Sequence, residues 1–597
     1  MNVSPLAGKT DLVAVTVLVD GNAIPDTYQV STVKVVREVN RIGTARITLT
    51  DGDASTGTFA ISEAATFVPG AKVEIKMDYH NQAVSVFKGI VVKHGIRVRE
   101  HGAAQLFVTC SDSAIRMTVG RKSTIYQDTT DESVLKTLIQ GHRLTADVES
   151  TNVTYKELVR YYSTDWDFMV SRAEVNGKLV LVDDARVTVC SPAVAEECGL
   201  IVKYGDSLKV LEAEIDARNQ YTQVSTTAWD IDEQKVLTVN SADPTINDQG
   251  NLDGSTLAGV LAAGTFELNS PAPLANDDLQ QWADAQLLKS RLARIRGTVT
   301  FQGNSKAVPG KTIQLAGLGA RFNGQAFVAR VTHTVEHGNW LTEVGFGLSP
   351  RWFVEEQSDI EAPAAAGLLP GINGLQIGTV KKIDADPLTL TRVQLDLPLI
   401  DSAGKGIWAR LGTPYASDGA GIQFMPEIGD EVMVGFVNGD PRFPVVLGSL
   451  YSSKHTPPYT PDQPNTNKGI VTKGKLKITL QDADKIVTIE TPGGQKVVLS
   501  DNGSSINISD SNQNSVKMTS SGIALSSPKD ISIKATGSVS IEGTGSGVTI
   551  KSSLSVHSEA PAISADASAT LKLNGNAAAE LTSSALVAVN GGVVTIN

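Results

Sequence analysis

The chain has 597 residues, of which 41% are hydrophobic and 19% charged, a balance typical of folded protein and not of a disordered chain. Its net charge of -12, without any cluster of Lys and Arg, excludes a protein that binds nucleic acid mainly through phosphates. Aromatic residues make up only 5% while Gly is plentiful, which favours strands and turns.

The length predicts about four structural units at roughly 150 residues per domain. No run of 18 apolar residues occurs, so we expect no transmembrane helix. The first residues lack a basic stretch followed by an apolar one, so we expect synthesis in the cytoplasm without a signal peptide. Cys110, Cys190 and Cys198 are too sparse for a disulfide framework or a zinc site, and we expect reduced thiols.

Residues 1–357 are expected to form a hub of strands with a few helices. Thr129-Thr130-Asp131-Glu132 reads as a T-x-x-E capping box before a helix. A second helix is expected from Leu279 to Ile295, where apolar residues recur at helical spacing after the capping residues Asn276-Asp277-Asp278.

The hub contains an internal echo at a constant offset of 240 residues. The matched pairs are Pro69-Gly70 with Pro309-Gly310, Val73 with Ile313, Ile75 with Leu315, Phe87 with Phe327, and Val91 with Val331. The echo predicts two related β-barrel modules, at about residues 1–120 and 215–355, with a helical and β insert between them. Three chains would present six such modules, which would let a threefold assembly dock onto a sixfold one.

No residue pattern predicts catalysis, a cofactor or a metal. His333 and His337 lie on a predicted strand, where four residues span roughly 13 Å, too far for one ion. The glycines of 543–547 lack the following Lys of a phosphate loop. One alternative stays open at His557, which could bind an ion together with two copies of itself if it faced a threefold axis.

A linker rich in Ala, Pro and Gly is expected at 358–371, followed by a compact β domain at 372–455. Its short strands, separated by Gly, Pro, Asn and Asp, predict a five-stranded barrel of the OB type. Asn438-Gly439-Asp440-Pro441 predicts a turn between two of these strands. The domain has few basic or aromatic side chains, which argues against binding of single-stranded nucleic acid.

Behind a second linker at 456–475, residues 476–597 are expected to form a needle of short apolar-x-apolar units whose steps cluster at eight residues. The predicted core residues are Ile506, Ile508, Val516, Met518, Ile523, Leu525, Ile531, Ile533, Val539, Ile541, Val548, Ile550, Leu554, Val556, Leu571, Leu573, Val587, Val589, Val594 and Ile596. Strands this short cannot bury an apolar face alone. An eight-residue step is also too short for a full turn of a single-chain solenoid. Three chains are therefore expected to wind together as a triple-stranded intertwined β-helix, with each strand paired to another chain.

Several motifs resemble VgrG and phage baseplate hub-spike proteins. In the barrel the resemblance begins at Trp408. It continues with the pattern P-x-x-G-x-E-V, followed by G-D-P-x-x-P-x-x-x-G, which is carried by Pro426, Gly429, Glu431, Gly439, Asp440, Pro441, Pro444 and Gly448. The segments 162–174 and 327–333 also resemble this family. The resemblance covers nearly the whole chain in the order hub, OB collar and needle. The moderate length, the short linker between collar and needle and the plain end are most similar to spike proteins of extracellular contractile injection systems of the antifeeding-prophage type.

The resemblance implies a homotrimeric spike that adapts a sixfold inner tube to a threefold needle and punctures a target membrane mechanically. The implied partners are the inner tube protein, baseplate components and a PAAR-type tip protein, with effectors as optional partners. Some relatives carry a muramidase after the collar or an effector after the needle. Here the linker is short and the chain ends just after Val594-Thr595-Ile596, so we expect no enzyme.

Two other interpretations stay open. The first is a type VI secretion VgrG or a phage tail spike of the same architecture. The second, from another class, is a trimeric adhesin or tail fibre. The location expected from the resemblance is a phage tail-like particle that is extracellular after its release.

Overall fold

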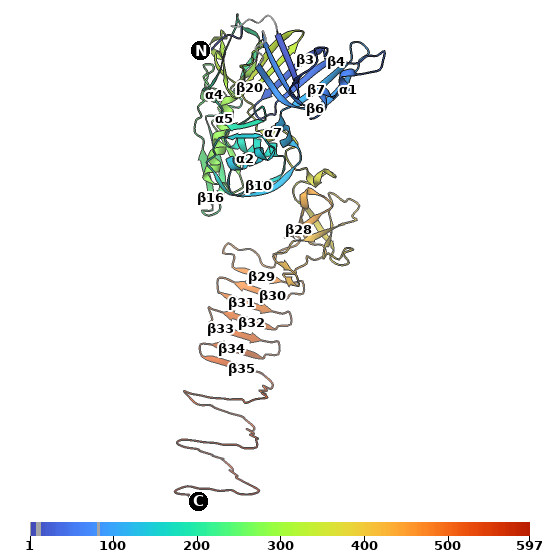
Figure 1. Ribbon diagram of the computed structural model, residues 1–597. Coiled ribbons are helices and arrows are strands. Elements are labelled where there is room, and N and C mark those ends of the chain that lie inside the picture. The colour runs from blue at the N-terminus through green and yellow to red at the C-terminus, as the bar shows by residue number, and fades with distance from the viewer. Residues whose placement is uncertain (1, 7–12, 80–83, 597) are drawn as a thin grey trace. The chain divides into compact units, whose positions relative to one another are not determined.

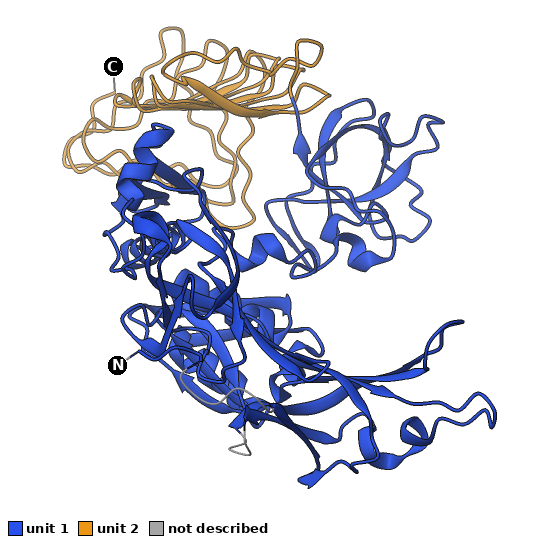
Figure 2. Cartoon of the chain, turned by 90° about the horizontal axis from the view of Figure 1, so that it is seen from above, with its two compact units in different colours: residues 1–450 blue, residues 451–597 orange. Residues whose placement is uncertain are grey.

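The computed structural model describes residues 2–6, 13–79 and 84–596, and it divides the chain into two compact units, residues 1–450 and 451–597 (Figure 2). Strands hold 39% of the residues and helices 13%, which confirms the predicted mainly β class. None of the helices formed by these residues is long and apolar enough to cross a bilayer.

Thirteen of the hub strands in the described residues join in one sheet rather than in two separate barrels. The strands are β1 (Val13–Val19), β2 (Asn22–Ala23), β3 (Val30–Glu38), β4 (Thr44–Thr50), β5 (Lys72–Tyr79), β6 (Val84–Arg97), β7 (Gln105–Ser111), β13 (Glu197–Lys203), β14 (Leu208–Ile215), β18 (Ile295–Gln302), β19 (Thr312–Ala316), β20 (Gly324–Glu336) and β21 (Asn339–Phe346). The two halves meet where β20 pairs antiparallel with β3, with His333 opposite Val35. Figure 1 labels β3, β4, β6, β7 and β20 of this sheet.

The two halves repeat one strand order, β3-β4-β7-β6-β5-β1 in the first and β14-β18-β21-β20-β19-β13 in the second. They differ in that β1 is antiparallel to β5 while β13 is parallel to β19. Each half also has its own apolar core, one around Ile47 and Ile75 and the other around Val299 and Ile313. The internal echo therefore corresponds to a repeated β module.

The hairpin that carries the echo is held by the same hydrogen bonds in both halves. The amide of Gly70 donates to the carbonyl of Val91 at 2.8 Å, and the amide of Gly310 donates to the carbonyl of Val328 at 2.9 Å. Both glycines have a positive φ, +100° and +87°, which a side chain would disfavour.

Val91 thus corresponds to Val328. In the second strand of the hairpin, equivalent residues are therefore separated by three residues fewer than the constant offset of 240. The expected pairs Phe87 with Phe327 and Val91 with Val331 are not structurally equivalent.

The insert between the halves combines strands with two helices, α2 (Asp131–Gly141) and α3 (Asp165–Val175). Its strands are β8 (Lys122–Thr130), β9 (Thr145–Val148), β10 (Thr154–Ser163), β11 (Leu179–Asp183) and β12 (Arg186–Cys190). The hydroxyl of Thr130 caps α2 by accepting from the amide of Ser133, so the cap lies one residue after the expected Thr129.

The helix expected from Leu279 is α5 (Asn276–Leu292), which begins three residues earlier. Its N-cap is Ala275, which has no side-chain cap, so the capping role expected of Asn276-Asp277-Asp278 is wrong. Asp277 and Asp278 lie in the first turn instead, where their charge favours the positive end of the helix dipole.

The segment 162–174 places a buried carboxylate at the junction of the insert with the rest of the hub. Glu174 of α3 accepts hydrogen bonds from the side-chain amide of Asn40 at 3.1 Å, from Nζ of Lys289 at 2.8 Å and from the amide of Phe353 at 2.6 Å. A buried carboxylate is tolerated only with such partners, so this segment fixes the packing of three parts of the hub.

The rest of the hub consists of a second small sheet and short helices. The sheet contains β15 (Gln223–Asp230), β16 (Lys235–Asn240) and β17 (Thr265–Ser270). The short helices are α1 (Ala60–Glu63), α4 (Gly254–Val260), α6 (Gly319–Phe322) and α7 (Phe353–Glu356).

The predicted five-stranded barrel is confirmed. Hydrogen bonds close β22 (Gln376–Lys382), β23 (Val393–Asp396), β24 (Ile407–Leu411), β28 (Pro444–Ser449) and β27 (Glu431–Phe436) into a ring. Val393, Leu395, Val432 and Val446 fill its interior and are fully buried. A two-residue pair, β25 (Ala416–Ser417) and β26 (Ala420–Gly421), lies outside the ring.

The second unit is a seven-stranded antiparallel meander followed by extended chain (Figure 1). The strands are β29 (Asn467–Val471), β30 (Lys477–Gln481), β31 (Ile486–Glu490), β32 (Lys496–Ser500), β33 (Ser505–Ser509), β34 (Ser515–Thr519) and β35 (Gly522–Ser526). Each strand pairs with the next strand of the same chain. The expectation that every needle strand pairs with another chain is therefore wrong for residues 506–526.

His333 makes the hub sensitive to acid at the junction of its two halves. The residue is 2% exposed and its Nδ1 lies 3.0 Å from Oγ1 of Thr342. Burial, and to a lesser degree the guanidinium of Arg37, lower the pKa of His333 from 6.5 to about 3. Between these values the unfolded chain binds a proton that the folded hub does not. Stability therefore falls as the pH falls, by up to about 1.4 kcal/mol per pH unit.

We expect His333→Gln to flatten the fall in the urea midpoint of the hub between pH 6.5 and 4.5, because the substituted side chain cannot titrate. The control is His337→Gln, since His337 lies on an exposed turn after β20 and should leave the slope unchanged. Parallel slopes for the His333 variant and the unsubstituted chain would contradict this account.

Candidate functional site: an apolar ladder on the C-terminal strands

Two rows of side chains run across one face of the meander β29–β35, because residues two apart in a strand share a face. Cross-strand partners in the first row are Ile470, Ile478, Ile489, Val497, Ile508, Val516 and Leu525. The second row starts at Lys468 and continues with Leu480, Val487, Leu499, Ile506, Met518 and Ile523. We call these two rows the apolar ladder.

The opposite face of the same strands has a different character. Its central row holds Gly469, Thr479, Thr488, Val498, Asn507, Lys517 and Ala524, and the residues at the strand ends flank this row on both sides. At the start of this row Tyr459 packs on the sheet, with its hydroxyl 2.7 Å from Oγ1 of Thr479. The sheet is thus amphipathic across its thickness.

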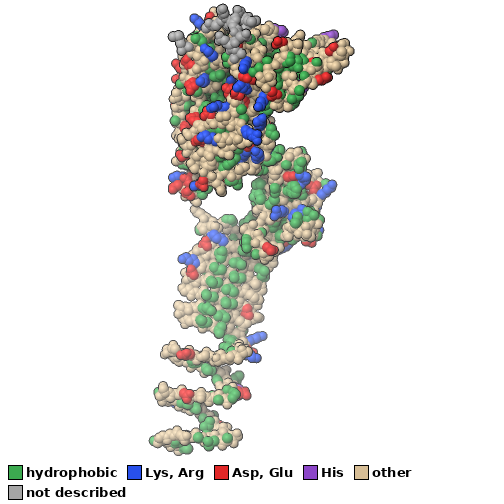
Figure 3. All heavy atoms as spheres, in the orientation of Figure 1, with side chains coloured by type: hydrophobic (Ala, Val, Ile, Leu, Met, Phe, Trp, Pro, Cys, Tyr) green, Lys and Arg blue, Asp and Glu red, His purple; other side chains and the backbone are tan. Residues whose placement is uncertain are grey.

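The apolar ladder is uncovered in the single chain. Ile478 is 41% exposed, Ile508 44% and Leu525 58%, and Figure 3 shows apolar side chains gathered in a band along the strands. A continuous apolar band of this kind is rare on a monomeric protein and marks a surface that another molecule covers.

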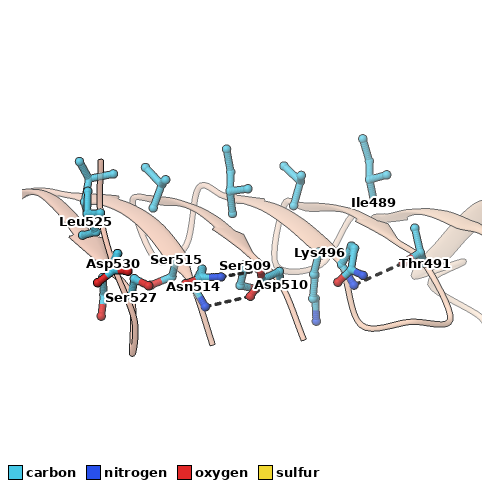
Figure 4. A pocket seen from close by; sticks show the side chains of 16 residues that line it. Ile489, Thr491, Lys496, Ser509, Asp510, Asn514, Ser515, Leu525, Ser527 and Asp530 are labelled. Atoms are coloured by element: carbon cyan, nitrogen blue, oxygen red, sulfur yellow. Dashed lines mark hydrogen bonds between the residues drawn. The ribbon is translucent and has the colours of Figure 1, made fainter. Parts of the chain in front are cut away.

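A groove of about 700 Å³ runs along the first row and is lined by its members from Ile489 to Leu525, together with the turns beside them. In Figure 4 Ile489 and Leu525 lie on the apolar side of the strands, while Asp510 and Asn514 lie in a turn at the strand ends. The groove contains no group of His, Cys, Asp or Glu that could hold a metal, within the part of the chain that the structure describes.

Repeated turns hold the register of the ladder. The amides of Thr472, Thr491 and Asp510 donate to the carbonyl four residues later, and the side-chain oxygen of each of the three accepts from that same later residue's amide. These turn residues recur every 19 positions, a period of two strands and two turns. Because a slip of one residue would move every ladder side chain to the other face, such turns fix which face is apolar.

The chain beyond β35 continues the apolar pattern without pairing. Between residues 527 and 596, all of which are described, there is neither a strand nor a hydrogen bond between backbone groups. Ile533 is 70% exposed and Leu573 80%. This segment carries unsatisfied backbone groups as well as uncovered apolar side chains.

The predicted core residues divide between these two parts. Those from Ile506 to Leu525 lie together in the apolar ladder, and those from Ile531 to Ile596 lie on the unpaired segment, where the single chain does not bring them into one cluster. The prediction also started too late. Ile478, Leu480, Val487, Ile489, Val497 and Leu499 belong to the same ladder, and the same apolar-x-apolar pattern in the sequence was the signal for them.

His557 has an ordinary surface environment in the chain. It is an exposed residue whose Nε2 lies 3.5 Å from a carboxylate oxygen of Glu559. Leu554 and Val556 take the apolar positions of this unit, so a period of two would put His557 on the polar side. The axial position that an ion site would need is therefore not favoured.

The barrel motif residues shape the β27–β28 turn and its flanks. Asp440 accepts from the amide of Arg442 at 2.9 Å and from its guanidinium at 2.7 Å, and the guanidinium lowers the pKa of the carboxyl. Gly439 and the preceding Asn438 have positive φ, and the carbonyl of Gly439 accepts from the amide of Ile372. Pro426 and Pro444 are buried.

The other motif positions add to the same turn and barrel wall. Gly429 has a φ of +94° before β27, Glu431 starts that strand, Pro441 follows the turn and Gly448 lies in β28. Trp408 of β24 lies under the guanidinium of Arg392, 5.9 Å from its ring centre. These residues shape the barrel wall and the β27–β28 turn.

Three family models match the chain. The model described as the Alg8 N-terminal domain matches residues 9–337, which is more than half of the chain. The type VI secretion system/phage-baseplate injector OB domain matches residues 376–451, and the phage baseplate V C-terminal trimerisation domain matches residues 485–550.

Individual relatives match smaller parts. The actin cross-linking toxin VgrG1 of Vibrio cholerae is 28% identical over 31% of this chain and 18% of its own length. The type VI secretion system spike protein VgrG1a of Pseudomonas aeruginosa is 25% identical over 27% of each chain. The chain thus spans about a quarter or less of the length of these relatives. A 43 kDa tail protein of prophage MuSo2 from Shewanella oneidensis superposes loosely, with a TM-score of 0.43 and 10% identity over 57% of this chain and 98% of that one.

The OB and trimerisation matches and the VgrG relatives confirm the resemblance to VgrG and phage baseplate proteins that the barrel motif indicated. The chain belongs to the family of the Alg8 N-terminal domain and carries, behind that domain, an injector OB domain and a phage baseplate trimerisation domain.

Proposed function

We propose that the chain is the central spike and hub of a contractile injection system. In this proposal a homotrimer adapts a sixfold inner tube to a threefold needle and punctures the target membrane mechanically. The observation that carries the proposal is the apolar ladder, whose register is fixed by the turns at Thr472, Thr491 and Asp510 and which its own chain leaves uncovered. Two further copies would bury the three ladders against one another around an axis.

The unpaired segment supports the same arrangement. Backbone groups need partners when they leave water, and side chains at 531–596 cannot leave water while the backbone beneath them is unpaired. Strands from two other copies, inserted between successive units of one chain, would pair the backbone groups and cover the apolar side chains. The needle would then consist of an upper part with pairing inside each chain and a lower part with pairing between chains.

A shaft of this kind suits mechanical penetration. Neighbouring strands stack roughly 4.8 Å apart along the axis, and an intertwined shaft has no free edge along its length. Axial load would then act on many backbone hydrogen bonds at once. A trimeric adhesin would share this shaft, but it has no need for an injector OB domain ahead of it.

The hub provides the adapter. The two repeated modules of each chain become six similar modules in a trimer, which is the number a sixfold tube requires. The proposed partners are the inner tube protein, other baseplate components and a PAAR-type tip protein at the far end, in a phage tail-like particle released from the cell. The proposed action is mechanical, and the matches to an injector OB domain and to a baseplate trimerisation domain support it.

We expect Ile489→Asp to prevent the full chain from forming a trimer, because it would put three carboxylates into the buried centre of the ladder. Thr488→Asp is the matched control, since it adds the same charge one residue away on the opposite face of β31. Ile533→Asp tests the lower segment in the same manner. The measurement is mass by light scattering. If the two variants on β31 assembled equally well, the apolar ladder would not be the contact surface.

Removing the ladder should also remove the trimer. Light scattering of the full chain is expected to give the mass of three chains of 63.0 kDa each, whereas a chain ending at residue 465 should be monomeric or weakly associated. A full chain that is folded and monomeric at micromolar concentration would contradict the proposed function.

A further inference from the structure

The loop between β22 and β23 of the collar barrel is built rigidly and yet presents two leucines to solvent. Leu388 and Leu390 are each 60% exposed. We call residues 385–391 the leucine loop. A surface loop that served only as a connection would be expected to carry polar residues at such positions.

The leucine loop adopts a backbone that its residues disfavour. Ala385, Thr389 and Thr391 all have positive φ, at 53°, 54° and 57°. For a β-branched residue such as Thr this conformation is a genuine outlier, and such outliers persist only where surrounding contacts enforce them.

One carboxylate enforces the conformation. Asp386 accepts from the amides of Leu388 at 3.0 Å, Leu390 at 2.8 Å and Arg392 at 3.2 Å, and from the guanidinium of Arg392 at 2.6 Å. Its side chain is 7% exposed. The two leucines are thus held in position before any partner arrives, which lowers the entropy cost of binding.

The same barrel carries a second apolar surface at the other end of β22. Leu375 is 55% exposed, Ile377 49% and Leu447 51%. Leu375 and Leu447 both pack beside Gly435 of β27. We call these three residues the barrel patch.

We propose that the leucine loop of one chain docks on the barrel patch of the next chain around the threefold axis. This inference rests on the proposed function, because the trimerisation domain that matches residues 485–550 would bring three barrels together. Residues 452–466 between the barrel and the ladder form a short tether, so the local concentration of the neighbouring barrel is high. Two different surfaces on one domain make a head-to-tail contact, which closes as a ring when the rotation is threefold.

The test is cross-linking between chains in the full-length protein. The variant Leu388→Cys with Ile377→Cys is treated with a short bismaleimide and separated on a denaturing gel. Species of two and three linked chains are expected, because each copy would place its loop cysteine at the patch cysteine of its neighbour. A link inside one chain leaves the chain number unchanged and cannot imitate this result.

The matched control is Leu399→Cys with Ile377→Cys. Leu399 lies in the next loop of the barrel and is 90% exposed, so exposure alone would favour it. The yield of linked chains should be at least roughly tenfold lower in this control than in the test variant, because without the contact the two cysteines have no raised effective concentration. The unsubstituted chain with Cys110, Cys190 and Cys198 gives the background.

Light scattering on the same samples separates the two levels of the argument. A trimer that cross-links through Leu388→Cys and not through Leu399→Cys supports the contact. A trimer in which both pairs link equally, or neither links, overturns the contact and leaves the proposed spike intact. A monomer overturns both.

Discussion

The structure depends on one constraint, which is that the C-terminal sheet has an apolar face that its own chain does not cover. Seven strands are locked in register by repeated turns, so the face cannot be hidden by a slip or a rearrangement of the strands. A partner must therefore cover it, and the trimerisation domain matched by the same region indicates copies of the chain itself.

The proposed roles of the barrel, the hub and the unpaired segment all follow from that constraint. Association at the ladder would gather three barrels and three hubs, and thereby turn a duplicated β module into six similar ones. It would also supply strands to the segment that has none of its own. The meander β29–β35 can form within one chain, whereas the segment 527–596 needs strands from the other chains. We therefore expect assembly to start at the meander and to proceed toward the C-terminus.

Much of this could be predicted from the sequence. The alternation in Ile506-Asn507-Ile508 predicted both the strands and their apolar side, and the turn at Asn438-Gly439 predicted a hairpin that the barrel contains. Both signals are local, because they depend on side-chain alternation and on backbone conformations that few residues favour.

Non-local features were harder to predict. Whether a strand pairs with its own chain or with another depends on the turns that flank it. The hydrogen-bonded turns at Thr491 and Asp510 reverse the chain so that each strand pairs with the preceding strand of the same chain. The alternation of apolar residues does not reveal this, because it is the same in the paired and the unpaired parts. The echo in the hub was found at Gly70 and Gly310. The second hairpin is three residues shorter than the first, so a comparison at one constant offset pairs the wrong residues in its second strand. The strain at Thr389 and Thr391 has no signature in composition or spacing.

The most direct measurement is amide hydrogen exchange along the second unit of the full chain in solution. Amides of residues 531–596 have no backbone acceptor within a single chain, whereas those of β30–β34 bond to neighbouring strands of the same chain. If three chains intertwine, the amides of the apolar-x-apolar units throughout 531–596 should be protected to a degree comparable with the meander. Free exchange at 531–596 beside a protected meander would contradict the intertwined needle.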